Sequence, residues 1–167
     1  MRWKIGLLMA CGKGFRGEWE DTSAQVIREL VEEELQGEIV EYRVVPEEKD
    51  ELMAALIEMT DYYKADLILT AGGIGMGPGD ITPEATLAVV DRLAPGFAEA
   101  MRAEQMKRSP LAMLTRAVSG IRGRTLILNL PADPKGVHEC LEAVMYQLPV
   151  ALAMLRGNVG SGVSAPE

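Results

Sequence analysis

Apolar runs alternate along the chain with segments whose apolar positions recur at helical spacing. Three continuous apolar runs predict strands buried on both faces, at residues 4–10, 66–70 and 125–130. Residues 39–45 predict a further strand, which Pro46 closes. Helical spacing predicts helices over residues 22–35, 48–63, 84–93, 97–107 and 134–148. The apolar run at 111–119 fits a helix and a strand equally well.

Polar and proline residues mark the ends of these helices. Residues 21–23 offer side-chain oxygens that would cap the first helix, and Thr82 is placed to cap the helix that Pro83 opens. Pro134 opens the last helical region, and Pro149 breaks or kinks that region near its end. The small and polar residues 157–167 predict a disordered tail after one domain at residues 1–156.

Strands that alternate with helices predict an α/β fold, with a parallel sheet covered on both faces. In such sheets ligands bind beyond the carboxyl ends of the strands, at a switch in strand order. This rule selects the loops after Ala10, Thr70 and Leu130 as candidate binding loops before any motif is considered.

The loop after Thr70 carries the most distinctive chemistry. Gly72, Gly73 and Gly75 allow positive φ and bring backbone N–H groups close to an anion. A helix that opens at Thr82 adds its positive dipole end, and Asp80 lies between the two. A carboxylate beside an anion site is consistent with a divalent cation that bridges it to phosphate. The alternative is a glycine-rich turn in which Asp80 is a local cap. The spacing fits neither a Walker loop nor a dinucleotide fingerprint.

Charge and composition narrow the classes of partner. Asp and Glu outnumber Lys and Arg by 25 to 17, and the net charge of −8 argues against nucleic acid while leaving a small phosphorylated ligand open. No apolar run approaches the ~20 residues needed to span a bilayer, so no membrane partner is expected. The first apolar run stops at residues 11–13, which suits a buried strand better than a signal peptide and predicts a cytoplasmic protein. Cys11, Cys140 and His138 make no metal-ligand spacing.

The glycine loop and the helix that follows it resemble a known family signature. Residues 70–86 read TAGGIGMGPGDITPEAT and resemble the signature T-x-G-G-T-G-x-x-x-x-D-x-T-P-E-A-T. That signature marks the molybdenum-cofactor biosynthesis domain of molybdopterin adenylyltransferases and of the gephyrin G domain. Residues 17–21, 117–123 and 129–135 resemble further segments of the family in the expected order, so the similarity covers about residues 5–155.

The resemblance implies a three-layer α/β/α fold with a mostly parallel central sheet, assembled as a homotrimer. It also implies a reaction, in which the terminal phosphate of molybdopterin attacks the α-phosphate of Mg·ATP. The products are adenylyl-molybdopterin and pyrophosphate. Such a transfer needs positioning and charge neutralisation more than covalent help from the protein.

The same resemblance assigns site residues. Asp80 and Glu47 match the two catalytic carboxylates and would hold Mg²⁺, although Glu47 stands where the family has an aspartate. The backbone of the three glycines would cradle phosphate. The residues predicted to shape the nucleotide or pterin pocket are Asn129, Pro131 and Lys135.

Several departures from the family pattern lie in the same loops. Residues 11–13 read CGK in place of S-D-R, Ile74 replaces a threonine, and Gly79 replaces a common arginine. Ala132 and Asp133 replace a glycine and a small polar residue in the last loop. Two alternatives to the enzyme therefore stay open: a non-catalytic molybdopterin carrier or regulator, and a trimeric interaction module with a vestigial site.

Overall fold

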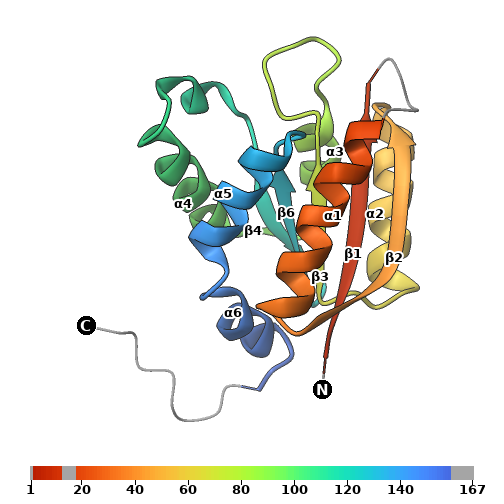
Figure 1. Ribbon diagram of the computed structural model, residues 1–167. Coiled ribbons are helices and arrows are strands. Elements are labelled where there is room, and N and C mark those ends of the chain that lie inside the picture. Colours follow the sequence, from red (N-terminus) through yellow and green to blue (C-terminus); the bar gives the residue numbers. More distant parts are fainter. Residues whose placement is uncertain (1, 13–17, 159–167) are drawn as a thin grey trace.

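The computed structural model describes residues 2–12 and 18–158, and it places a twisted sheet between two layers of helices (Figure 1). The strands are β1 (Trp3–Cys11), β2 (Gly37–Pro46), β3 (Leu67–Ala71), β4 (Arg92–Leu93), β5 (Ser119–Arg122) and β6 (Thr125–Leu130). The helices are α1 (Glu18–Glu33), α2 (Lys49–Asp61), α3 (Thr82–Val89), α4 (Pro95–Met106), the 3₁₀ helix η1 (Pro110–Leu114), α5 (Pro134–Val144) and α6 (Leu148–Leu155). The predicted three-layer α/β/α fold is confirmed.

The order of the strands decides which loops meet. The described residues form one sheet in the order β2-β1-β3-β6-β5-β4. The first four of these strands are parallel, with Leu7 beside Leu69 and Leu69 beside Leu128, whereas β4 and β5 run antiparallel to their neighbours. Because β1, β3 and β6 are adjacent and parallel, the loops that follow them leave the same edge of the sheet.

Alternation along the central strands builds two cores. In β1, Ile5, Leu7 and Met9 pack under α1, α4, α5 and α6, whereas Leu8 and Ala10 pack under α2 and α3. Every residue of β3 and β6 is buried. The continuous apolar runs follow from this burial on both faces, which is typical of parallel strands.

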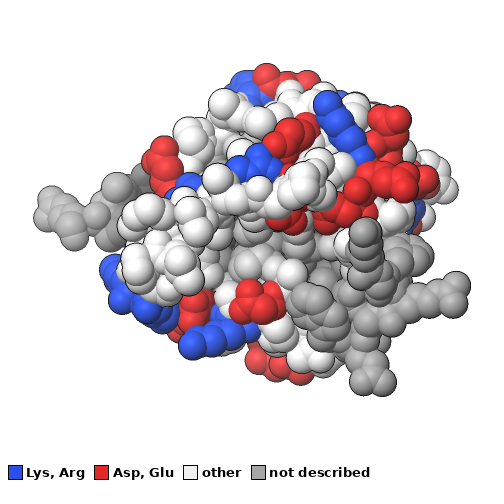
Figure 2. Space-filling model, turned by 90° about the horizontal axis from the view of Figure 1, so that it is seen from above, with Lys and Arg blue, Asp and Glu red and all other residues white. Residues whose placement is uncertain are grey.

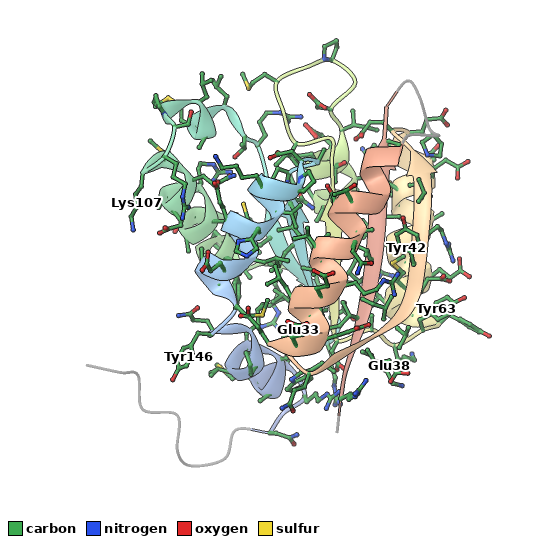
Figure 3. The ribbon with its side chains drawn as sticks, in the orientation of Figure 1. Glu33, Glu38, Tyr42, Tyr63, Lys107 and Tyr146 are labelled. Atoms are coloured by element: carbon green, nitrogen blue, oxygen red, sulfur yellow. The ribbon has the colours of Figure 1, made fainter. Side chains whose placement is uncertain are left out.

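Polar side chains lie on the outside of the helix layers. Figure 3 shows Glu33 of α1 and Lys107 at the end of α4 on the outside of the molecule, and both residues are exposed. Across residues 2–12 and 18–158, no helix is both long and apolar enough to span a bilayer.

Two predicted helix caps are wrong. α1 begins at Glu18, so residues 21–23 lie inside the helix, and the buried Ser23 hydroxyl donates a hydrogen bond to the carbonyl of Ala132. α3 begins at Thr82 itself, with Ile81 in the cap position and no side-chain cap. Both hydroxyls are used in tertiary contacts that local spacing does not reveal.

The β4 edge of the sheet and the segments near it also differ from the prediction. The helix predicted to reach Leu93 ends at Val89, and Arg92–Leu93 form a short edge strand. The ambiguous run at 111–119 contains η1 and leads into β5. The region after Pro134 divides into α5 and α6, as Pro149 indicated. The predicted disorder of the tail concerns residues 157–167, of which 159–167 lie outside the described residues.

Candidate functional site

The three selected loops meet around one cavity. It has a volume of about 530 Å³ and lies at the carboxyl end of the parallel strands. Its described lining comes from the ends of β1, β2, β3 and β6: Met9, Ala10, Cys11, Gly12, Pro46, Glu47, Glu48, Ala71, Gly72, Gly73, Gly79, Asp80 and Ala132. Figure 2, which looks onto this end of the molecule, shows acidic side chains gathered toward one side of it. The rule for parallel sheets thus located the cavity correctly.

Two glycines of the loop after β3 are required by its geometry. Gly72 has φ of +100°, and its N–H donates to the carbonyl of Leu130 at 3.0 Å. A Cβ at Gly72 would collide with the carbonyl of Ala10. Gly73 has φ of +68°, and a Cβ there would collide with the side chains of Glu47 and Thr82. Glycine at these positions lets the loop close against β1 and β2.

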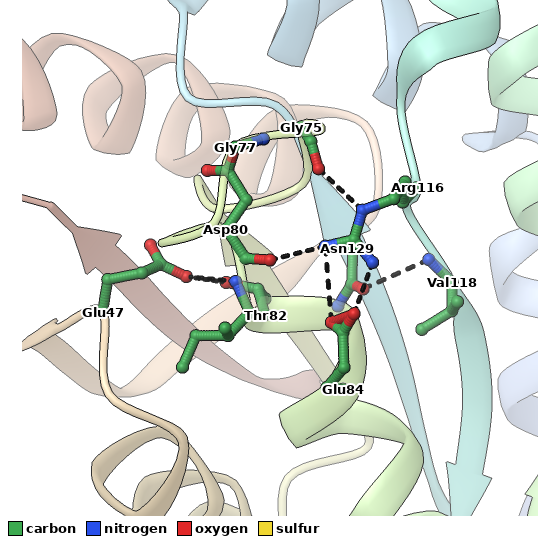
Figure 4. Close-up of polar contacts among 10 residues, drawn as sticks. Glu47, Gly75, Gly77, Asp80, Thr82, Glu84, Arg116, Val118 and Asn129 are labelled. Atoms are coloured by element: carbon green, nitrogen blue, oxygen red, sulfur yellow. Dashed lines mark hydrogen bonds and ion pairs between the residues drawn. The ribbon is translucent and has the colours of Figure 1, made fainter.

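Glu47 lies partly buried at the end of β2 and faces this turn. Its Oε1 accepts hydrogen bonds from the Thr82 hydroxyl at 2.8 Å and from the Ile81 N–H at 3.3 Å (Figure 4). Burial raises the pKa of Glu47 above its usual value. The two hydrogen bonds oppose that rise, and the nearby charge of Asp80 adds to it. Among the described residues, Oε2 accepts no hydrogen bond and is left for a ligand.

Asp80 closes a separate turn, at residues 77–80. Its Oδ2 accepts a hydrogen bond from the Gly77 N–H at 2.9 Å, while its own N–H donates to the Gly77 carbonyl at 3.0 Å. Asp80 is therefore a local cap, as one interpretation of the sequence proposed. Its Oδ1 has no hydrogen bond to any described residue. Glu47 thus uses one carboxylate oxygen to bond the start of α3, and Asp80 uses one to bond the 77–80 turn.

This donor set fits a magnesium ion. Mg²⁺ prefers hard oxygen ligands and is commonly bound by one or two carboxylates together with water and substrate phosphates. The described part of the chain contains no cluster of three or more His, Cys, Asp or Glu side chains that would enclose a metal by itself. Glu47 and Asp80 would therefore supply part of the coordination, and a phosphate ligand would supply more.

Two other predicted site residues, Thr82 and Asn129, are both fully buried. The Thr82 hydroxyl supports Glu47. The Asn129 Oδ1 accepts from the Val118 N–H at 3.1 Å, and its Nδ2 donates to the hydroxyls of Thr70 and Thr86 at 2.9 and 3.0 Å. Asn129 is not among the described residues of the cavity wall, because its side chain cross-links β6, β3 and α3.

In the loop after β6, Ala132 is the one described residue that lines the cavity. Pro131 is buried and Lys135 is exposed, and neither is part of the cavity wall, which Ala132 reaches. A ligand contact by Pro131 or Lys135 is therefore not supported by this geometry. Asp133 accepts a hydrogen bond from the Gly136 N–H at 2.8 Å as the N-cap of α5, so its carboxylate is directed to the helix.

Sequence reasoning missed Arg116, whose guanidinium contacts both ends of the loop that carries Asp80. Arg122 bonds the Val89 carbonyl and pairs with Asp61, and it is not among the residues of the cavity wall. The available signal was position, because Arg116 directly precedes the recognised segment 117–123.

Comparisons with known proteins identify the family of the chain. Residues 7–150 match a family model described as a probable molybdopterin binding domain. A molybdopterin adenylyltransferase of Helicobacter pylori (strain J99) is 42% identical over 155 residues, which are 92% of this chain and 88% of that protein. The molybdopterin adenylyltransferase of Escherichia coli K12 is 39% identical over 84% of this chain and 73% of its own length.

Solved structures give the same result. The crystal structure of the molybdopterin biosynthesis enzyme MoaB from Thermus thermophilus superimposes with a TM-score of 0.86 at 46% identity, over 93% of this chain and 97% of that one. The family match spans most of the chain and includes the second part of β1, the glycine loop and β6. The chain therefore belongs to the molybdopterin binding domain family.

Proposed function

We propose that this protein is a molybdopterin adenylyltransferase of molybdenum-cofactor biosynthesis, which transfers AMP from Mg·ATP to the terminal phosphate of molybdopterin. Relatives about 40% identical over most of the chain carry that name. The observation that carries the proposal is the pair Glu47 and Asp80, which flank the glycine turn at one cavity, each with one oxygen left for a cation.

The reaction asks for positioning more than for a protein nucleophile. An oxygen of the molybdopterin phosphate forms a bond to the α-phosphorus of ATP, the bond from that phosphorus to the bridging oxygen of the β-phosphate breaks, and pyrophosphate leaves. Bound Mg²⁺ supplies neutralisation of the charge on the phosphate oxygens. Glu47 and Asp80 would hold the ion in place, and glycine at positions 72 and 73 lets the loop pack closely against Ala10 and Glu47.

The departures from the family pattern are compatible with this role. Glu47 is longer than aspartate, and the structure uses its extra reach for the hydrogen bonds to Thr82 and Ile81. Ile74 is buried and Asp133 caps α5, so neither substitution adds a charge to the cavity wall. These observations favour an active site over a vestigial one.

Two further features stay predictions: assembly as a homotrimer, which the resemblance implies, and residence in the cytoplasm, which the short first apolar run predicts. Light scattering of the purified protein tests the first, because a trimer has three times the mass of the chain. Fractionation of the native host tests the second.

Mass spectrometry tests the proposed function. The purified protein is incubated with molybdopterin, ATP and Mg²⁺, and the adenylylated pterin and pyrophosphate are measured. The proposal predicts that both products form, and that Asp80→Asn lowers the rate by about 100-fold or more, the usual cost of removing one charge-stabilising group. Binding of molybdopterin without product would support a carrier instead. Absence of saturable binding would support an interaction module.

A further inference from the structure

Residues 72–81 connect β3 to α3, and residues 76–79 of this loop are exposed. After Asp80, the Ile81 N–H bonds the Glu47 side chain, and the Thr82 N–H bonds the Gly73 carbonyl. The bonds between Gly77 and Asp80 shape the turn but do not connect it to the rest of the fold. Arg116 makes that connection: its Nε donates to the Gly75 carbonyl at 2.7 Å, and its guanidinium also donates to the Asp80 carbonyl (Figure 4).

Two additional contacts complete the attachment. The Arg116 guanidinium forms an ion pair with Glu84 in the first turn of α3. The backbone N–H of Arg116 donates to the Ile74 carbonyl at 2.7 Å. One residue therefore contacts the loop at its beginning, at its end, and at the helix that follows. Removing the guanidinium would remove the contacts to Gly75, Asp80 and Glu84, while the backbone bond to Ile74 would remain.

Arg116 is itself held in position. Arg102 of α4 donates to the carbonyls of Thr115 and Ala117 at 3.2 and 2.8 Å, on either side of Arg116. Two residues further on, Val118 donates its N–H to Asn129 of β6. The backbone that carries Arg116 is thus fixed to both α4 and the sheet, which gives the guanidinium a rigid base.

We propose that Arg116 is a positioning residue of the reaction, because it clamps the two ends of the 75–80 loop and so orients the Asp80 carboxylate toward the metal and the phosphates. This inference rests on the proposed function. Arginine suits the task because its planar fork donates to several acceptors at once, whereas lysine offers one point charge. Arg116 is absent from the cavity wall among the described residues, so it acts through Asp80 and not on the substrate.

Electrostatics support positioning over direct charge stabilisation. The hydrogen bond from Arg116 lowers the pKa of Glu84, which is therefore an anion at neutral pH and offsets the guanidinium charge. A neutralised arginine contributes little attraction for phosphate at a distance. Its loss should therefore change the geometry of the loop more than the affinity for an anionic substrate.

The test compares Arg116→Gln with Arg122→Gln. Arg122 is a control because its guanidinium likewise bonds a backbone carbonyl and a carboxylate, those of Val89 and Asp61, and it is not among the described residues of the cavity wall. Hydrogen exchange of amides 76–82 reports the clamp directly, and titration with Mn²⁺ in the absence of substrate reports the metal site. Steady-state kinetics separate kcat from the KM for molybdopterin.

We expect Arg116→Gln to speed exchange at amides 76–82 and to weaken Mn²⁺ binding and kcat by about 10- to 100-fold, the usual effect of losing a residue that orients a metal ligand. The KM for molybdopterin should change by less than about threefold, since uniform substrate binding is retained. Arg116→Lys should not restore kcat. Added guanidinium ion at millimolar concentration should partly restore it in Arg116→Ala. Arg122→Gln should match the wild type in all four readouts.

Three outcomes would overturn the inference. Unchanged exchange in Arg116→Gln would refute the clamp. Faster exchange with wild-type Mn²⁺ affinity and kcat would refute the positioning role while leaving the proposed function intact. If Arg116→Gln fails to fold, Glu84→Gln removes one contact of the clamp and should give a smaller change in the same direction; no change in exchange there would also count against the inference. Failure of the wild type to make product would instead refute the proposed function, with the exchange result unaffected.

Discussion

The buried amide of Asn129 gives a sharp prediction about stability. Its side chain makes three hydrogen bonds, to the Val118 N–H and to the hydroxyls of Thr70 and Thr86, and all three partner residues are fully or largely enclosed. Asn129→Ala removes all three bonds. Since each intramolecular hydrogen bond contributes about 1 kcal/mol net, we expect the free energy of unfolding to fall by about 3 kcal/mol. The cavity left by the amide adds to that loss.

Thr60 provides the matched control. It is also buried, but its hydroxyl has no hydrogen-bond partner within residues 2–12 and 18–158. Thr60→Val therefore replaces an unsatisfied hydroxyl with a methyl group of similar volume. We expect this variant to unfold at the same urea concentration as the wild type or at a higher one, because burying an unpaired hydroxyl is unfavourable.

Urea unfolding followed by circular dichroism measures both variants. The midpoints are compared at equal slope, so that a change in midpoint reports a change in stability. A loss below about 1 kcal/mol for Asn129→Ala would contradict the account of Asn129 as a cross-link between β6, β3 and α3. A loss for Thr60→Val as large as that for Asn129→Ala would show that burial, and not hydrogen bonding, governs these sites.

Three further predictions concern the cavity and the core. Gly73→Ala should lower adenylylation by about 100-fold, as expected for a displacement on the order of 1 Å at a reacting site. Gly96→Ala, where a Cβ meets nothing within 4 Å and the residue is not among the described residues of the cavity wall, should retain wild-type rates in the same assay. The pKa of Glu47 is raised in the folded state, so the folded protein binds this proton more tightly than the unfolded chain does. The stability that this proton contributes should be present below pH 4.5 and be lost as the pH rises through the raised pKa. Glu47→Gln should remove that part of the pH dependence in urea melts. Burial raises the pKa of Cys140 to about 12, so iodoacetamide at pH 8 should label Cys140 only in denaturant, and rapid labelling of the native protein would contradict its burial.

The central strands could be predicted because strands that are buried on both faces have continuous apolar sequences. β1, β3 and β6 are covered on both faces, so each reads as an uninterrupted apolar run. The edge strand β4 could not be predicted in this way. It consists of two exposed residues, Arg92 and Leu93, whose pairing with Gly120 and Ile121 comes from distant sequence.

Part of the candidate site could also be predicted from local sequence, whereas contacts between distant residues could not. The glycine loop and Asp80 follow a buried strand, so the rule for parallel sheets places them at the cavity without a structure. Arg116 was missed because its partners Gly75 and Asp80 lie 41 and 36 residues earlier. The cross-link by Asn129 could not be predicted, because a polar residue at a strand end is consistent with ligand binding and with a buried cross-link, and the partners Thr70 and Thr86 come from distant sequence.

The central claim is that Glu47 and Asp80 hold one catalytic cation at the glycine turn. The most direct measurement is the Mg²⁺-dependent rate of adenylyl-molybdopterin formation by Glu47→Gln, Asp80→Asn and the double variant. If the two carboxylates serve one ion, the account predicts that each single variant loses about 100-fold and that the double variant is little worse than either. Full activity in either single variant, or independent and multiplying losses in the double variant, would contradict the claim.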